Sequence, residues 1–290
     1  MPPLTFGMNV ATAAGRGADP VGAARAAERL GFDFVSASDH PSGAHPTYET
    51  WTMLTWIAAS TSRIAVATRV LGVPYRPPAM VAKMAETLDR LSGGRLILGL
   101  GGGYSDDEFR AFGLPVPTAG EKVVGLEEAV RITRGLWSEP AFAFRGQRYA
   151  TVDAHLEPKP GHRIPIWMGT FGDRALAVTG RHADGWIPSL GSASAEQLPV
   201  MRAKVLAAAK AAGRRADDLT CALNVTVHVG YDGDGGPDIV SGSADRVATR
   251  LAGFVAQGFT TFNFMPVGDS TPEQMDRIAA EVIPALRAPG

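Results

Sequence analysis

The sequence predicts an α/β fold, a single (β/α)8 barrel of the TIM type that spans residues 1–290 as one domain. Short apolar runs that end in turn residues alternate eight times with segments that have the apolar periodicity of helices. The length of 290 residues is close to the ~250 typical of this fold. No segment has the composition of an interdomain linker, so a barrel fits better than a doubly wound sheet with a second domain.

The first half of the chain is expected to hold four strands and four helices. Asp19 is a helix N-cap and Pro20 takes the first helical position, where no N–H is needed. Gly93-Gly94 ends a helix, because glycine adopts a positive φ without a Cβ clash. A polar loop is expected after Tyr104. The predicted strands are 4–10, 32–38, 64–70 and 95–100, and the predicted helices are 20–30, 49–60, 79–91 and 121–137.

The second half continues the alternation after an insertion. Residues 142–152, with Gly146-Gln147 in the middle, predict a small β-hairpin before the fifth strand. Four more strands and four more helices follow. The predicted strands are 164–168, 184–188, 219–229 and 260–265, and the predicted helices are 173–181, one that begins near Ser194, 243–257 and one that begins near Thr271.

Composition excludes several classes of partner. There are 28 basic and 29 acidic residues with no run of either sign, so we expect no binding to nucleic acid or to an anionic membrane. No apolar stretch approaches the ~20 residues needed to span a bilayer. Cys221 is the one cysteine, and residues 1–30 show no signal peptide. We therefore expect a soluble, cytoplasmic protein.

Binding and catalysis in a β/α barrel occur at the C-terminal ends of the strands. These ends are Asp39-His40, Gly72-Val73, Gly101 to Tyr104, Gly169 to Gly172 and Pro188-Ser189. Gly101, Gly102 and Gly103 leave one strand end without side chains, so that a flat ligand or an anionic group could lie against the backbone. A plain turn without a ligand is the alternative. His40 and His45 lack the spacing of a zinc site, and we expect no metal.

Six segments together resemble the luciferase-like monooxygenase superfamily, within it the branch that uses the deazaflavin coenzyme F420. They cover about half of the chain. The segments are 38–40 (Ser-Asp-His), 75–79 with 82–83 (Tyr-Arg-Pro-Pro-Ala and Ala-Lys), 87–95 (Thr-Leu-Asp-Arg-Leu-Ser-Gly-Gly-Arg), 99–104 (Gly-Leu-Gly-Gly-Gly-Tyr), 158–160 with 166–169 (Pro-Lys-Pro and Ile-Trp-Met-Gly) and 183–186 (Ala-Asp-Gly-Trp).

The resemblance implies a barrel that binds a flavin or deazaflavin. Its phosphate is expected at Gly169, Thr170, Phe171 and Gly172, where the N–H groups and dipole of a helix N-terminus also favour an anion. A helix start capped by water is the alternative. The family often carries a non-proline cis peptide bond after the third strand, and we expect it at Gly72-Val73, with a plain turn as the alternative.

The resemblance also places polar residues at the reactive edge of the ring. Asp39 and His40 are the expected catalytic residues, with His40 handling a proton. In the alternative, Asp39 orients His40 for structural reasons only. Tyr104 is expected beside the cofactor, with the glycines at 101–103. Certain sugar-phosphate dehydrogenases of the family have a catalytic glutamate where this chain has Tyr104, which argues against that substrate.

The expected function is that of an F420-dependent oxidoreductase that transfers a hydride between the deazaflavin and a small organic substrate. Two alternatives stay open. The first is an FMN-dependent monooxygenase supplied with reduced flavin by a separate reductase, and the second is a barrel that binds a flavin-like ligand without catalysis. We also expect a homodimer.

Overall fold

The computed structural model describes residues 3–231, 233, 235–268 and 270–287 and shows a closed barrel of eight parallel strands. Each strand pairs with its neighbours around the ring, and the pairing of the last strand with the first closes it. This confirms the predicted TIM barrel. The strands are β1 (Thr5–Asn9), β2 (Phe34–Ala37), β3 (Ala65–Thr68), β5 (Leu96–Gly101), β8 (Ile166–Met168), β9 (Gly185–Trp186), β10 (Thr220–Val229) and β12 (Thr261–Pro266).

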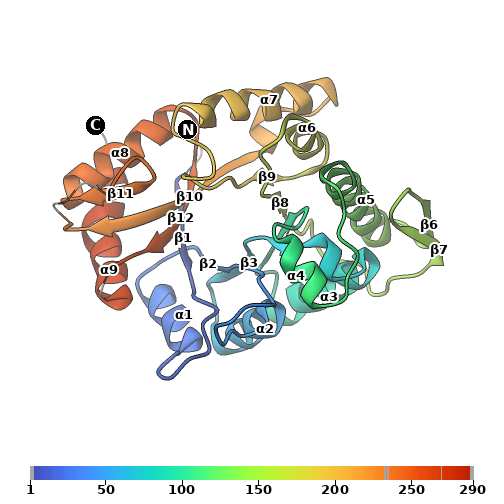
Figure 1. Cartoon of the computed structure of the whole chain (residues 1–290), viewed down its shortest axis with the longest axis horizontal. Helices are drawn as coiled ribbons and strands as arrows, with labels where there is room; N and C mark the ends of the chain where they lie inside the picture. The colour runs from blue at the N-terminus through green and yellow to red at the C-terminus, as the bar shows by residue number, and fades with distance from the viewer. Residues whose placement is uncertain (1–2, 232, 234, 269, 288–290) are drawn as a thin grey trace.

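Helices surround this barrel (Figure 1). Asp19 caps α1 by accepting the N–H of Gly22, and Gly93 ends α3 in the left-handed conformation with φ of 75°, both as predicted. Among the described residues, every helix is too short or too polar to cross a bilayer. The surrounding helices are α1 (Pro20–Arg29), α2 (Thr50–Ser60), α3 (Pro78–Ser92), α5 (Ala119–Ser138), α6 (Asp173–His182), α7 (Gln197–Ala211), α8 (Ala244–Ala256), α9 (Thr271–Arg277) and α10 (Ile283–Arg287), with a π-helical turn at Ile278–Val282.

The predicted hairpin is present as β6 (Phe142–Arg145) and β7 (Ala150–Ala154), which lie outside the barrel at the edge of the molecule (Figure 1). Glu128 of α5 holds its turn. The buried carboxylate accepts the backbone N–H groups of Gln147, Arg148 and Tyr149 at 2.5, 2.9 and 2.8 Å. The insertion is therefore fixed by a side chain of the main fold.

Three short elements differ from the sequence-based expectation. The loop expected after Tyr104 contains α4 (Asp106–Ala111), whose start is capped by Ser105. A strand β11 (Ile239–Gly242) pairs with β10, and β4 (Leu71–Gly72) pairs with β5. Each of the three has six residues or fewer, too few to show a clear apolar period, and each is held by neighbours distant in sequence.

The inside of the barrel is apolar at its base and polar toward the mouth. Phe34 and Trp167 pack edge to face at 5.6 Å between ring centroids, and Gly7 makes room, because a Cβ there would lie 2.1 Å from the Phe34 ring. Above them, Ser36 donates to Asn263, and Asn263 to Asn224, each at 2.9 Å. Asn224 of this polar layer lines the pocket described next.

Candidate active site

A cavity of about 360 Å³ opens at the C-terminal ends of the strands. This is within the range typical of ligand sites. Most of the predicted site residues line it, from four different strand ends. These are Asp39, His40, Gly72, Gly101, Gly102, Gly103, Tyr104, Gly169 and Phe171. Val73, Thr170 and Gly172 do not line it. The side chains of Val73 and Thr170 are buried, and Gly172 is the N-cap residue of α6.

One wall of the pocket consists of glycines packed against Val70. A Cβ at Gly101 would lie 2.6 Å from Val70 Cγ2, and one at Gly169 would lie 3.2 Å from it. Gly103 has φ of 89°, and a Cβ there would lie 2.5 Å from the ring of Phe109. The glycines therefore leave room for the side chains of Val70 and Phe109, and they also leave backbone open to a ligand.

The non-proline cis peptide bond predicted at Gly72-Val73 lies instead between Arg69 and Val70, so that prediction is wrong in position. The strand predicted to reach residue 70 ends at Thr68. Because the chain leaves the barrel wall earlier, the bulge begins earlier too, and Gly72 returns to pair with Gly101. Thr68 links the departing strand to Gly99, whose carbonyl accepts from its hydroxyl at 2.7 Å.

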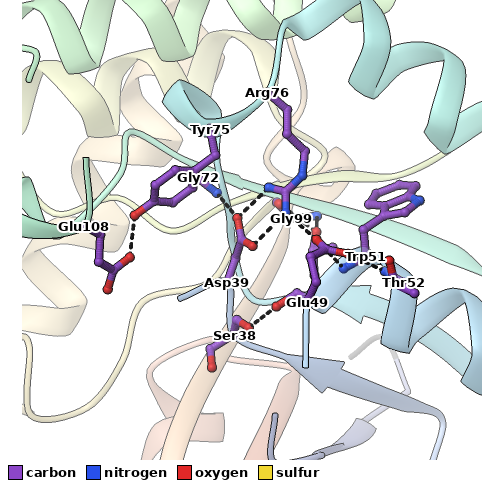
Figure 2. Close-up of polar contacts among 12 residues, drawn as sticks. Ser38, Asp39, Glu49, Trp51, Thr52, Gly72, Tyr75, Arg76, Gly99 and Glu108 are labelled. Atoms are coloured by element: carbon purple, nitrogen blue, oxygen red, sulfur yellow. Dashed lines mark hydrogen bonds and ion pairs between the residues drawn. The ribbon is translucent and has the colours of Figure 1, made fainter. Parts of the chain in front are cut away.

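Asp39 is locked in an ion-pair network on one side of the mouth (Figure 2). Its carboxylate accepts the Gly72 N–H at 2.9 Å and two guanidinium nitrogens of Arg76 at 2.8 and 3.0 Å. Arg76 also pairs with Glu49 at 2.5 Å. Burial works to lower the pKa of Arg76, but the hydrogen bonds and charges of Asp39 and Glu49 outweigh it and raise that pKa. These contacts favour a positioning role for Asp39.

His40 is paired with Glu108 rather than with Asp39. Its Nδ1 lies 2.9 Å from Glu108 Oε1, and the Tyr75 hydroxyl donates to Glu108 Oε2 at 2.5 Å. Burial, with the adjacent Glu108 charge, raises the pKa of Tyr75, so this hydroxyl remains a donor. The side chain of His40 is 49% exposed and that of Glu108 is 13% exposed. The carboxylate therefore has a fixed position beneath an accessible imidazole.

Helix α4 brings Glu108 to this position. Ser105 caps the helix, and the buried ring of Phe109 packs 4.9 Å from that of Tyr75, centroid to centroid. Lys122 of α5 adds an ion pair to Asp106 at 2.7 Å. Sequence reasoning placed a loop here and missed Glu108. The signal was present as the serine at 105 followed by three acidic residues, the pattern of a capped helix start.

Other residues of the pocket were also missed. Tyr75 lies in the 75–79 motif, outside the predicted strands, and Asn224 lies within a predicted strand, so neither appeared at a predicted strand end. Ser192 follows β9 in a loop. The missed lining residues are Arg69, Val70, Tyr75, Ile187, Ser192 and Asn224.

The N-terminus of α6 lies beside the pocket. No side chain caps it, and a Cβ at its N-cap residue Gly172 would meet nothing within 4 Å. Phe171 lines both this pocket and a neighbouring hollow that contains Asp173 and Lys204, which are paired at 2.6 Å. The uncapped N–H groups and the helix dipole make this end suitable for an anion.

The family model described as luciferase-like monooxygenase matches residues 4–234. An F420-dependent glucose-6-phosphate dehydrogenase of Kineococcus radiotolerans is 30% identical, with 90% of each chain covered. An F420-dependent secondary alcohol dehydrogenase, solved with an F420-acetone adduct, superposes with a TM-score of 0.88 at 19% identity over 99% of this chain and 100% of that chain. EDTA monooxygenase from Chelativorans has a TM-score of 0.84 at 15% identity over 98% of this chain and 93% of that chain.

The chain therefore belongs to the luciferase-like monooxygenase family, as its sequence motifs suggested, and it is an enzyme. Within that family it belongs to the branch with the F420-dependent dehydrogenases.

Proposed function

We propose that this enzyme uses coenzyme F420 to transfer a hydride to or from a small organic substrate that carries a hydroxyl or carbonyl group. The observation that carries the proposal is the His40–Glu108 pair, 2.9 Å apart, at the rim of a pocket with a glycine wall. The F420-dependent relative supports the choice of cofactor.

The residues present fit such a cofactor. The wall formed by Gly101, Gly102 and Gly169 presents backbone to a flat ring, and the uncapped start of α6 would hold its phosphate. Coenzyme F420, when bound, supplies a ring carbon that exchanges a hydride. Val70 of the bulge would support the ring from behind, because it packs against two of these glycines.

His40 would handle the proton that accompanies the hydride. With Nδ1–H donated to the Glu108 carboxylate, Nε2 is the free nitrogen that accepts the proton of a substrate hydroxyl during oxidation. The hydroxyl-bearing carbon loses its hydride in the same conversion, and a carbonyl results. Glu108 stabilises the imidazolium, and Tyr75 holds Glu108 in place.

Two relatives indicate which substrates to test first. The Kineococcus enzyme is named for glucose 6-phosphate and the superposed structure for secondary alcohols. Glu108 supplies a carboxylate at the mouth that the residue at position 104 does not. The presence of tyrosine at 104 is therefore a weaker argument against a sugar substrate than the sequence suggested.

The experiment is a titration of the apoprotein with F420 and, separately, with FMN, each followed by fluorescence. We expect F420 to bind at least tenfold more tightly. The F420 complex should then change visible absorbance with a panel of secondary alcohols and sugar phosphates. Tighter binding of FMN, with substrate-dependent oxygen consumption, would instead support a monooxygenase function. EDTA monooxygenase is an example of that function among the structural neighbours.

A further inference from the structure

Arg69 lines the pocket and has no role in the chemistry proposed above. Its backbone N–H donates to the Ala37 carbonyl at 2.8 Å, which continues the β2–β3 ladder by one residue. Ala65 and Ala67, on the same face of that strand, pack in the inner cluster of the barrel with Phe34. Arg69 is next in this alternation, so its side chain enters the pocket from the barrel interior.

The guanidinium of Arg69 has no acidic partner among the residues that the structure describes. Among the described residues, its one side-chain hydrogen bond is the Nε–H donated to Asn9 Oδ1 at 3.2 Å. Asp39, which lines the same pocket, is already engaged by Arg76 and the Gly72 N–H. Nη1 and Nη2 therefore donate no hydrogen bond to a described side chain.

The charge of Arg69 is open to a ligand in the apoprotein. Burial lowers the pKa of Arg69 to about 10, which leaves the group charged at neutral pH. The Arg69 side chain is partly exposed where it lines the pocket, so an anionic ligand there would gain a charge-assisted contact with it. Arg76, which lies at the same mouth, is by contrast paired with two carboxylates, those of Asp39 and Glu49.

We propose that Arg69 is an anion-binding residue of the pocket, whose Nη1 and Nη2 hold two acceptor atoms of a negatively charged group. Guanidinium geometry suits such a two-point contact. The group is either a carboxylate or phosphate of the substrate, or the pyrimidine edge of the reduced cofactor ring, which carries negative charge. The second source rests on the proposed function, and the first does not depend on F420.

The test compares Arg69→Met, which keeps length without charge, with Arg69→Lys and with Arg16→Met, a change at an exposed arginine that does not line the pocket. Thermal unfolding of each apoprotein is measured with sodium phosphate or sodium acetate at constant ionic strength. Affinities for oxidised and reduced F420 are measured by fluorescence and equilibrium dialysis. We expect the Met variant to be about as stable as the unsubstituted apoprotein, because Arg69 makes no ion pair with a described residue and one hydrogen bond is lost.

Two results support the proposal and identify the source. In the first, Arg69→Met loses at least tenfold in affinity for reduced F420 and less for the oxidised form, and Arg69→Lys partly restores the affinity. This result identifies the cofactor ring as the group that Arg69 binds. In the second, F420 affinity is unchanged, and the stabilisation by phosphate or acetate is lost in Arg69→Met but not in Arg16→Met. This result identifies an anionic group of the substrate as the ligand of Arg69. Thermal unfolding in phosphate or acetate tests the anion site even if the protein binds no F420. In that case the proposed function fails and the anion site stands.

Two results overturn it. One is a Met variant whose apoprotein melts several degrees lower, which makes Arg69 a structural residue. The other is a Met variant that matches the unsubstituted protein in every anion and cofactor titration.

Discussion

At the scale of single residues, the partner of His40 is central to the proton transfer that we propose. The order Asp39-His40 suggested a pair, but adjacent residues of an extended segment point in different directions. The structure directs Asp39 to Arg76 and His40 to Glu108. The sequence predicted the histidine, whereas the carboxylate beside it comes from a helix 68 residues further along.

His40→Ala should lower kcat by about 100-fold to 10,000-fold, the usual contribution of a placed proton-transfer group. Affinity for F420 should change little, since the proposed cofactor contacts lie on the glycine wall and at α6. Steady-state kinetics and fluorescence titration measure the two effects. Glu108→Gln keeps a hydrogen-bond acceptor without the charge and should give a smaller loss of kcat. Near-normal turnover in His40→Ala would make this histidine structural.

At the scale of elements, the open N-terminus of α6 permits a test in which helix stability and ligand affinity change in opposite directions. Gly172 has φ of −73° and ψ of 150°, an N-cap conformation with space for a side chain. Gly172→Asp should stabilise the helix by about 0.5 kcal/mol.

The same substitution should weaken F420 binding about tenfold by repulsion of the phosphate. Gly172→Asn caps the helix without a charge, so the difference between the two variants isolates the electrostatic effect. Fluorescence titration and urea unfolding supply the two readouts. Equal F420 affinities for Asp, Asn and unsubstituted protein would place the phosphate elsewhere.

At the same scale, a carboxylate of α1 holds the residues just before β3. The Glu28 carboxylate accepts the N–H groups of Ser62, Arg63 and Ile64 at 2.9, 2.6 and 3.0 Å. Burial alone would raise the pKa of Glu28, but these hydrogen bonds and the Arg63 charge lower it to about 2. The stabilisation is therefore complete above the unfolded value of 4.5 and is lost as pH falls toward 2.

Glu28→Gln should lower the free energy of unfolding by about 1 kcal/mol at pH 7, a modest figure because the site is partly solvated. The variant and the unsubstituted protein should approach each other in stability between pH 4.5 and pH 2. Urea unfolding at pH 7 and pH 3 measures this. Glu139→Gln, at an exposed position, is the control. A deficit that does not shrink on acidification would show that the charge of Glu28 is not responsible.

At the scale of the whole molecule, closure of the ring depends on both ends of the chain, because β1 pairs with β12. One domain over residues 1–290 is our proposal for the organisation. Limited proteolysis should then release no stable half, since either half alone would have two unpaired strand edges. A protease-resistant fragment that refolds by itself would contradict this.

The homodimer and the cytoplasmic location stay predictions. Sedimentation equilibrium should give twice the 30.4 kDa of the chain. A monomer mass at micromolar concentration would refute the dimer. The site itself would be unaffected, because every residue used in the proposed chemistry comes from one chain.

The sequence alone determined the eight strand–helix units, the hairpin and most of the glycine wall, because these depend on local periodicity and on residues with special backbone freedom. Local signals also placed His40 at a strand end. Only the tertiary structure decided what meets at the mouth. Glu108, Tyr75, Arg69 and Asn224 acquire their positions from strand pairing and helix packing across the barrel. Such contacts join residues far apart in the chain, and no local pattern encodes them.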